Sequence, residues 1–356
     1  MVRARWSSRT IFLFAAIGSA VGLGNLWRFP YLTHKFGGGA FLIPYLIALL
    51  VLGTPLLILE FAVGQKLQKG AVDAFKTVHH KLSGIGYGAL VAAFIVVTYY
   101  SAIMAWALVY FINSFQSKLP WAVDPSGFFF NGVLQISEGV GTFGGINWLL
   151  FSALAAVWIT IYFCVRRGVK SVGKIVAITM PLPIILLVVL LLRGITLNGA
   201  ASGIWYYLAP NFAALLSTDI WIAAASQIFF TLSLAFGIML AYASYNKETQ
   251  DILGDAYITG IANSAISLLA GFVVFSVLGY MSTTTSLPIE EVVAAGPGLA
   301  FIVFPQALSL MPWGNFFSAL FFLTLLTLGI DSAFSLVEGI NTAIMDRRTT
   351  DNKRKD

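Results

Sequence analysis

Eight long apolar segments divide the chain, and polar residues gather mainly in the stretches between them. The segments cover residues 9–32, 40–64, 88–115, 147–165, 171–193, 219–245, 254–281 and 312–345. A helix of about 20 residues crosses a hydrocarbon core of about 30 Å at about 1.5 Å per residue. The pattern therefore predicts an all-α polytopic membrane protein with eight transmembrane helices, forming one domain over residues 1–356.

Composition supports the same fold class. The chain is 58% hydrophobic and 10% charged, with a mean hydropathy of +0.86, whereas soluble domains carry about 25% charged residues. A water-soluble protein is excluded because the apolar faces would have nothing to pack against. We expect a surface helix within the loop 66–87. The loop 282–311 is apolar and rich in proline, so we expect it to fold back over the protein as a lid.

The basic residues are distributed unevenly between the two sides of the predicted spans. Seventeen of the 21 Lys and Arg residues fall on the side of the two termini, and the other side holds four. This positive-inside asymmetry predicts a multi-pass protein of a prokaryotic inner membrane with both termini in the cytoplasm. The net charge of +6 then reflects topology and contact with anionic lipid, and no nucleic-acid partner is expected. Cys164 is the single cysteine, so an intrachain disulfide is excluded.

Two spans contain residues that weaken a helix near its middle. The first has GSAVGLGN at 18–25, and the sixth has SLAFG at 233–237. A break in lipid exposes backbone groups that protein, water or ligand must satisfy. Glycine used for close helix packing is the alternative reading, but Asn25, Thr231 and Ser233 lie beside these glycines and favour broken helices. Two such spans, five helices apart, predict inverted repeats with a shared site.

Specific motifs carry a resemblance to a known family. GLGNLWRFPY at 22–31 is followed by GGGAF at 37–41, and QIFFTLSL at 227–234 comes later in the same order and spacing. These motifs resemble the first and sixth helices of the neurotransmitter:sodium symporter family. The resemblance implies sodium-coupled symport of a neutral, hydrophobic amino acid by alternating access, without enzymatic activity. A homodimer is left open.

The resemblance also implies a difference in length. Family members have eleven or twelve helices, with a core of five plus five. The chain has eight predicted helices, and family helices nine onward are absent, so we expect a truncated chain with an incomplete inverted repeat. A remnant that binds ligand or partners without transport is the first alternative. A membrane enzyme is the second, but the three histidines (His34, His79 and His80) fall in predicted loops and no nucleophile motif is present.

The resemblance implies two sodium sites at the first break, and a broken helix suits ions because it offers carbonyl oxygens at one stub and amides at the other. The first site would use Ala20, Asn25, Thr231 and Asn263 with the substrate carboxylate. The second would use Gly18, Val21, Leu328, Asp331 and Ser332. Asp331 can also be argued from its depth, because an acid in mid-membrane is costly and no Lys or Arg is predicted near it. Protonation or a buried base is the alternative. Glu60 is expected to be a structural, hydrogen-bonded or protonated acid.

The hypothesis about the substrate rests on the glycine at position 22. Amine-transporting relatives have an aspartate at this place, so glycine implies a substrate that brings its own carboxylate. The resemblance implies a substrate site of eleven residues: Ala20, Leu23, Gly24, Val96, Tyr100, Phe230, Thr231, Ser233, Phe236, Ser332 and Leu336.

Chloride and gating residues complete the implied set. Ser267 lies four residues after Asn263, on the same helix face, where chloride-independent relatives have an acid. A chloride site of Tyr45, Gln227, Thr231 and Ser267 is therefore implied, and simple packing of Ser267 is the alternative. Arg28 and Tyr100 resemble an outer gate. Arg3, Trp6, Tyr245 and Asp346 resemble an inner gate with an Arg3–Asp346 ion pair, for which ordinary solvated charge is the alternative.

Overall fold

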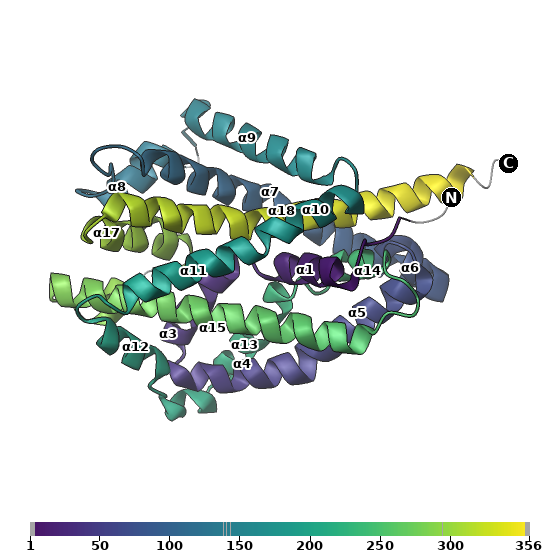
Figure 1. The fold of residues 1–356 in the computed structure, drawn as a ribbon, viewed down its shortest axis with the longest axis horizontal. Coiled ribbons are helices and arrows are strands. Elements are labelled where there is room, and N and C mark those ends of the chain that lie inside the picture. The colour runs from purple at the N-terminus through teal and green to yellow at the C-terminus, as the bar shows by residue number, and fades with distance from the viewer. Residues whose placement is uncertain (1–3, 138, 140, 143, 294, 353–356) are drawn as a thin grey trace.

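A computed structural model of the chain describes residues 4–137, 139, 141–142, 144–293 and 295–352. Within these ranges the protein is helical, and its one β-bridge joins Gly38 to Pro210. The longest helices run nearly parallel along the molecule, and the N- and C-terminal ends lie at the same end of the bundle (Figure 1). The predicted all-α class is confirmed.

Six helical segments of the described residues are long and apolar enough to cross a membrane. They are Gly39–Leu67 (η1 Gly39–Phe41, α4 Leu42–Ala48, η2 Leu49–Gly53, α5 Thr54–Leu67), His80–Asn113 (η3 His80–Leu82, α7 Ser83–Asn113), α9 Trp148–Val165, Val169–Gly194 (α10 Val169–Thr179, α11 Pro181–Gly194), α15 Ile252–Thr285, and Gly314–Arg347 within α18 Gly314–Asn352. A seventh is bent by 60°, between α1 Arg9–Ala20 and the pair α2 Leu23–Leu26 and α3 Arg28–Lys35.

The sixth predicted span is divided more deeply. It forms α13 Thr218–Thr231 and α14 Ile238–Ala243, separated by residues 232–237. Each half alone is too short to cross a hydrocarbon core, so length alone supports six or seven spans among the described residues. The count of eight stays a prediction.

Shorter helices connect the spans. They are α6 Ala71–Val78, α8 Pro125–Gly127, η4 Phe128–Leu134, α12 Ala200–Leu208, η5 Phe212–Leu216, α16 Ile289–Val292, η6 Leu299–Val303 and α17 Phe304–Ser309. The expected helix within 66–87 is α6. The expected fold-back of 282–311 is also observed, because α17 packs on α15 and α18 and the Tyr110 hydroxyl donates to the Phe301 carbonyl at 2.7 Å.

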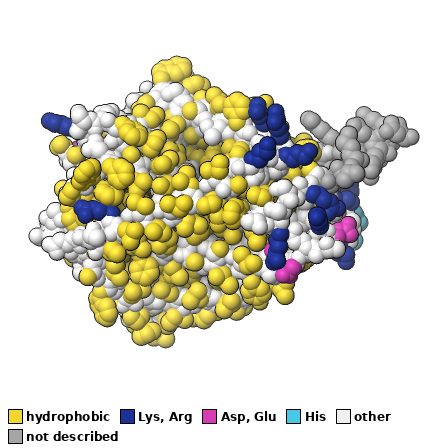
Figure 2. Space-filling model, viewed as in Figure 1, with side chains coloured by type: hydrophobic (Ala, Val, Ile, Leu, Met, Phe, Trp, Pro, Cys, Tyr) yellow, Lys and Arg dark blue, Asp and Glu magenta, His cyan; other side chains and the backbone are white. Residues whose placement is uncertain are grey.

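Burial separates central helices from outer ones. In each spanning helix we compare the most apolar stretch of 18 residues. The protein buries 67% of this stretch in α15 and 61% in α18, but only 22% in α9. Apolar side chains cover the visible flank, whereas Lys and Arg gather chiefly at the end that holds the termini (Figure 2). An apolar surface that protein leaves uncovered suits contact with lipid chains. The central helices position the candidate site, and the outer ones surround it.

Candidate functional site

The first span breaks at two residues. α1 ends at Ala20 and α2 begins at Leu23, and the intervening Val21 and Gly22 have extended backbones. A Cβ atom added to Gly22 would lie 2.7 Å from the Ser332 hydroxyl and 2.8 Å from the Tyr100 hydroxyl. A side chain at this position would therefore displace the Ser332 or Tyr100 hydroxyl, so glycine lets both hydroxyls approach the break closely.

The second break is longer and has an unusual backbone. Ser233, Ala235 and Gly237 all have φ between +53° and +72°, and left-handed non-glycine residues each cost about 1–2 kcal/mol. The Ala235 amide donates to the Glu60 carboxylate at 2.8 Å. Glu60 therefore holds the broken segment by a hydrogen bond, as expected from the sequence.

The two breaks meet at one cavity of about 40 Å³. All eleven residues of the predicted substrate site line it, together with Ser19, Gly22 and Asn25. None of these fourteen residues is charged. The Leu23 amide donates to the Tyr100 hydroxyl at 3.1 Å, so this pair lies where a carboxylate is expected. The structure brings the eleven residues together, and their role as ligands stays a prediction.

Three side chains of the first predicted sodium site form one polar cluster. The side-chain oxygen of Asn263 accepts one hydrogen bond from the side-chain nitrogen of Asn25 at 3.0 Å and another from the Thr231 hydroxyl at 3.1 Å. The Asn263 amide nitrogen is buried and has no partner among the described residues. Three buried oxygen-bearing side chains within hydrogen-bond distance fit a hard cation such as sodium.

The predicted chloride residues continue this cluster. The side-chain nitrogen of Asn25 donates to the Ser267 hydroxyl at 2.8 Å. The Tyr45 hydroxyl lies 3.5 Å from the same Ser267 hydroxyl. The Gln227 side-chain oxygen accepts from Arg28, and its buried nitrogen has no partner within the described ranges. A buried N–H donor without an acceptor, beside hydroxyl groups, fits an anion.

The second predicted sodium site borders another small cavity. Gly18, Val21, Leu328 and Asp331 line this space of about 10 Å³, which suits one small ion or water. Asp331 is 2% exposed, and no Lys or Arg of the described residues pairs with it. Ser332, the fifth predicted ligand, donates to the Ser19 and Val21 carbonyls. A buried carboxylate without a basic partner fits a cation.

Thr179 is a site residue that the sequence did not reveal. It is the last residue of α10, and its hydroxyl donates to the Asp331 carboxylate at 2.5 Å. The available signal was a hydroxyl side chain in an apolar helix, which many helices contain without any function. Ser19 was missed for the same reason.

The two residues of the predicted outer gate, Arg28 and Tyr100, have different partners. The Arg28 guanidinium lies 5.5 Å from the centre of the Phe230 ring and donates to Gln227 at 2.5 Å and to Ser226 at 2.9 Å. Among the described hydrogen bonds, none joins Arg28 to Tyr100. Arg28 therefore lies over Phe230, a residue that lines the cavity, and its role as a gate stays a prediction.

The N-terminal segment, which holds part of the predicted inner gate, packs against α14. The Trp6 indole donates to the Tyr242 carbonyl at 2.8 Å, and the Tyr245 hydroxyl lies 2.8 Å from the Thr342 hydroxyl. Asp346 accepts from the Gly70 amide at 2.6 Å. Arg3 lies outside the described residues, so the predicted Arg3–Asp346 ion pair stays a prediction.

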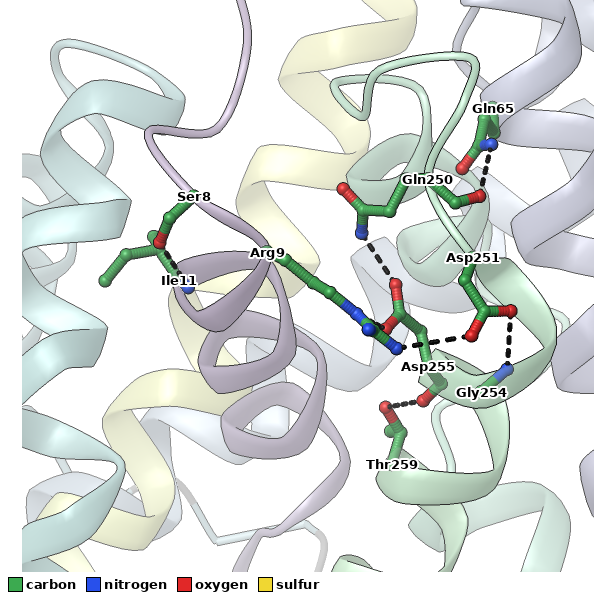
Figure 3. A network of polar contacts seen from close by, with 9 residues as sticks. All are labelled: Ser8, Arg9, Ile11, Gln65, Gln250, Asp251, Gly254, Asp255 and Thr259. Carbon is green, nitrogen blue, oxygen red and sulfur yellow. Dashed lines mark hydrogen bonds and ion pairs between the residues drawn. The ribbon is translucent and has the colours of Figure 1, made fainter.

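An ion pair that the sequence analysis did not predict lies beside this segment (Figure 3). Arg9 contacts Asp255 at 2.7 Å and Asp251 at 3.4 Å. Asp255 is fully buried and also accepts from Gln250 at 2.6 Å. Arg9 was counted only as a topology charge, yet it joins the start of α1 to the start of α15.

Comparison with known proteins identifies this arrangement. The profile of the sodium:neurotransmitter symporter family matches residues 3–126 and 122–356. The chain belongs to the sodium:neurotransmitter symporter family. This family consists of multi-pass membrane transporters of small molecules, not of enzymes, in agreement with the sequence analysis.

Individual relatives extend the comparison. An uncharacterized sodium-dependent transporter of Methanocaldococcus jannaschii is 44% identical over 99% of this chain and 72% of its own length. The creatine transporter of Torpedo marmorata is 41% identical over 97% of this chain and 61% of its own. The sodium- and chloride-dependent GABA transporter 2 of Bos taurus is 40% identical, with shares of 97% and 62%. The chain thus spans about three fifths of the creatine and GABA transporters.

Proposed function

We propose that this chain binds a neutral amino acid with an apolar side chain and transports it together with sodium by alternating access. One observation carries the proposal: the two helix breaks meet at a cavity whose fourteen lining residues include no charged side chain. A zwitterion fits such a site because its opposite charges can be met by backbone groups and bound ions.

Backbone groups and Tyr100 would orient the substrate. The Leu23 and Gly24 amides and the Tyr100 hydroxyl face a carboxylate, while the Ala20, Phe230 and Thr231 carbonyls face the ammonium. Val96, Phe236 and Leu336 border the side chain. The close approach of Tyr100 and Ser332 to Gly22 supports this assignment, because an acidic side chain there would have to displace these two hydroxyls.

Ions would balance the charge of the site. Two sodium ions and a zwitterion bring two positive charges into a buried region, where unbalanced charge is costly. Asp331 supplies one negative charge, and a chloride held by Tyr45, Gln227, Thr231 and Ser267 supplies the second. The name of the Bos taurus GABA transporter 2 states dependence on both ions.

The basic end of the bundle would face the cytoplasm of a prokaryotic cell, following the positive-inside rule. Trp6, Tyr245 and the Arg9–Asp255 pair would then close the cytoplasmic side, and Arg28 the external side. Alternating access requires these two closures to open in turn.

Binding of radiolabelled leucine, tryptophan and alanine in sodium, potassium and choline buffers tests the proposal. We expect saturable binding in sodium only, and equal binding in all three buffers would refute it. Uptake into proteoliposomes, measured on the same preparation, separates transport from binding alone. Binding without uptake would leave the chain as a ligand-binding remnant.

A longer zwitterion is the second candidate, because the relatives include creatine and GABA transporters. Both compounds are carboxylates with a distant cationic or polar group, and the hydroxyls of Ser19, Ser233 and Ser332 border the same cavity. Competition between leucine and either compound decides between the two candidates. Stronger competition by creatine or GABA than by alanine would favour this one.

A further inference from the structure

The turn between α9 and α10 carries four cationic side chains without a balancing acid in the same segment. Arg166 and Arg167 form the turn, and Lys170 and Lys174 follow on α10, all with exposed side chains. The stretch 148–193 contains no Asp or Glu. We propose that these four residues, the α9–α10 basic patch, bind the headgroup phosphate of an anionic phospholipid. This inference does not depend on the proposed transport function.

The patch lies where lipid headgroups are expected. Tyr162 and Phe163 end the exposed, apolar face of α9, with 61% and 50% of their surfaces exposed, and the Arg166 guanidinium lies 5.0 Å from the centre of the Phe163 ring. Aromatic rings mark the membrane–water interface, and Arg and Lys extend from it toward the headgroups. A lipid beside α9 therefore places its phosphate within reach of the patch.

The turn also has a geometry that suits a phosphate. Gly168, with φ of +56°, allows α10 to begin directly at Val169, and it provides no side chain to cap the first amides. The positive end of α10 therefore lies in the same segment as the four basic side chains and adds to their positive charge. Lys170 and Lys174 share one face of α10, and guanidinium groups can bind phosphate oxygens in pairs.

Acidic residues distinguish this patch from the other basic loops at the same end. The 66–81 loop contains Asp73, and the loop after α14 contains Glu248 and Asp251 beside Lys247. At the α9–α10 turn, the nearby acid is Glu338 on α18. Its carboxylate lies 3.7 Å from where a Gly168 Cβ would be.

Glu338 does not neutralise the outer face of the turn. Glu338 is 2% exposed, whereas Arg166, Arg167, Lys170 and Lys174 all have exposed side chains. A ligand from the bilayer can reach the four cations because they are exposed, while the Glu338 carboxylate is shielded by protein.

Native mass spectrometry of the purified full chain tests the proposal. The protein is titrated with phosphatidylglycerol or phosphatidylcholine in detergent, and retained lipids are counted. We expect at least about tenfold preference for phosphatidylglycerol, with a loss of about fivefold for each cation removed, and weaker binding at high salt. Replacing all four residues by Gln (R166Q, R167Q, K170Q and K174Q) should reduce retention to the phosphatidylcholine level.

Three comparisons keep the result interpretable. Lys76→Gln with Lys81→Gln removes two charges at the same end and should leave retention unchanged, and an equal loss there would overturn a localised site. Arg166→Lys with Arg167→Lys keeps the charge and should retain most binding, which guards against a misfolded Gln variant. If millimolar inorganic phosphate displaces phosphatidylglycerol, so that the patch does not prefer the lipid to the free anion, a lipid site is overturned. Equal retention of phosphatidylglycerol and phosphatidylcholine by the unmodified protein would overturn it as well.

Discussion

The two candidate cation sites border the same helix break but are built from opposite kinds of groups. One centres on the carboxylate of Asp331, which lies against Gly18 and accepts from Thr179. The other consists of the neutral side chains of Asn25, Thr231 and Asn263. We infer that the Asp331 site can hold a cation by itself. The neutral site needs negative charge from the substrate carboxylate, so sodium at this site and the substrate should bind cooperatively.

Removing the carboxylate of Asp331 should have the largest effect. Asp331→Asn keeps the size of the side chain but leaves a bound cation without its counter-charge, which costs about 3–5 kcal/mol for a buried pair. We expect sodium affinity to fall by at least about a hundredfold in a sodium titration. Glu60→Gln is the control and should lose only a hydrogen bond of about 0.5–1.5 kcal/mol. A larger loss in Glu60→Gln would reverse the comparison.

Adding one methyl group at the break should weaken substrate binding more than sodium binding at Asp331. In Gly22→Ala the new atom meets the Ser332 and Tyr100 hydroxyls at less than 3 Å, and overpacking costs about 1–3 kcal/mol. We expect substrate affinity to fall about tenfold to a hundredfold while sodium still binds at Asp331. Gly84→Ala, where nothing lies within 4 Å, is the matched control. Loss of sodium binding in Gly22→Ala would show that the two sites are not separable.

The Thr179 hydrogen bond should contribute a smaller part of the Asp331 site. A hydrogen bond to a charged group is worth about 1.5–3 kcal/mol, so Thr179→Val should weaken sodium binding about tenfold. Thr179→Ser keeps the hydroxyl and should restore it. Thr160→Val, in which the lost hydroxyl bonds only to its own helix, should have no effect. Identical affinities for Val and Ser at position 179 would remove Thr179 from the site.

Chloride should produce the smallest change, and at the neutral site. Replacing chloride by gluconate at constant sodium should lower substrate affinity a few-fold in the unmodified protein. Ser267→Glu supplies a fixed negative charge, so its affinity should depend little on the anion. Unchanged affinity of the unmodified protein in gluconate would eliminate the chloride site and leave both sodium assignments in place.

Much of the fold could be predicted from the sequence because apolar length determines membrane spans. The breaks were predicted from Gly22 and Gly237, but the left-handed backbone of Ser233 and Ala235 was not. Their side chains show no preference for that conformation, and tertiary contacts such as the Glu60 hydrogen bond impose it.

The candidate site was predicted mainly through family resemblance. Asn25 and Asn263 are 238 residues apart, and no local pattern could bring them together. Thr179 and the Arg9–Asp255 pair were missed because their roles depend on helix packing. A hydroxyl in an apolar helix and a basic residue before a span each have a common, simpler explanation.

The length of α15 sets the depth of the Arg9–Asp255 pair. At 34 residues the helix extends about 51 Å, whereas a helix tilted by about 20° needs only about 32 Å to cross the hydrocarbon layer. More than a third of α15 must therefore extend beyond that layer. Asp255 lies in the first turn of α15, so we infer that the ion pair lies at headgroup depth, where water can hydrate Arg9 if the helices separate. In a thicker bilayer the same pair would be drawn toward the acyl chains, and separating its charges would become harder.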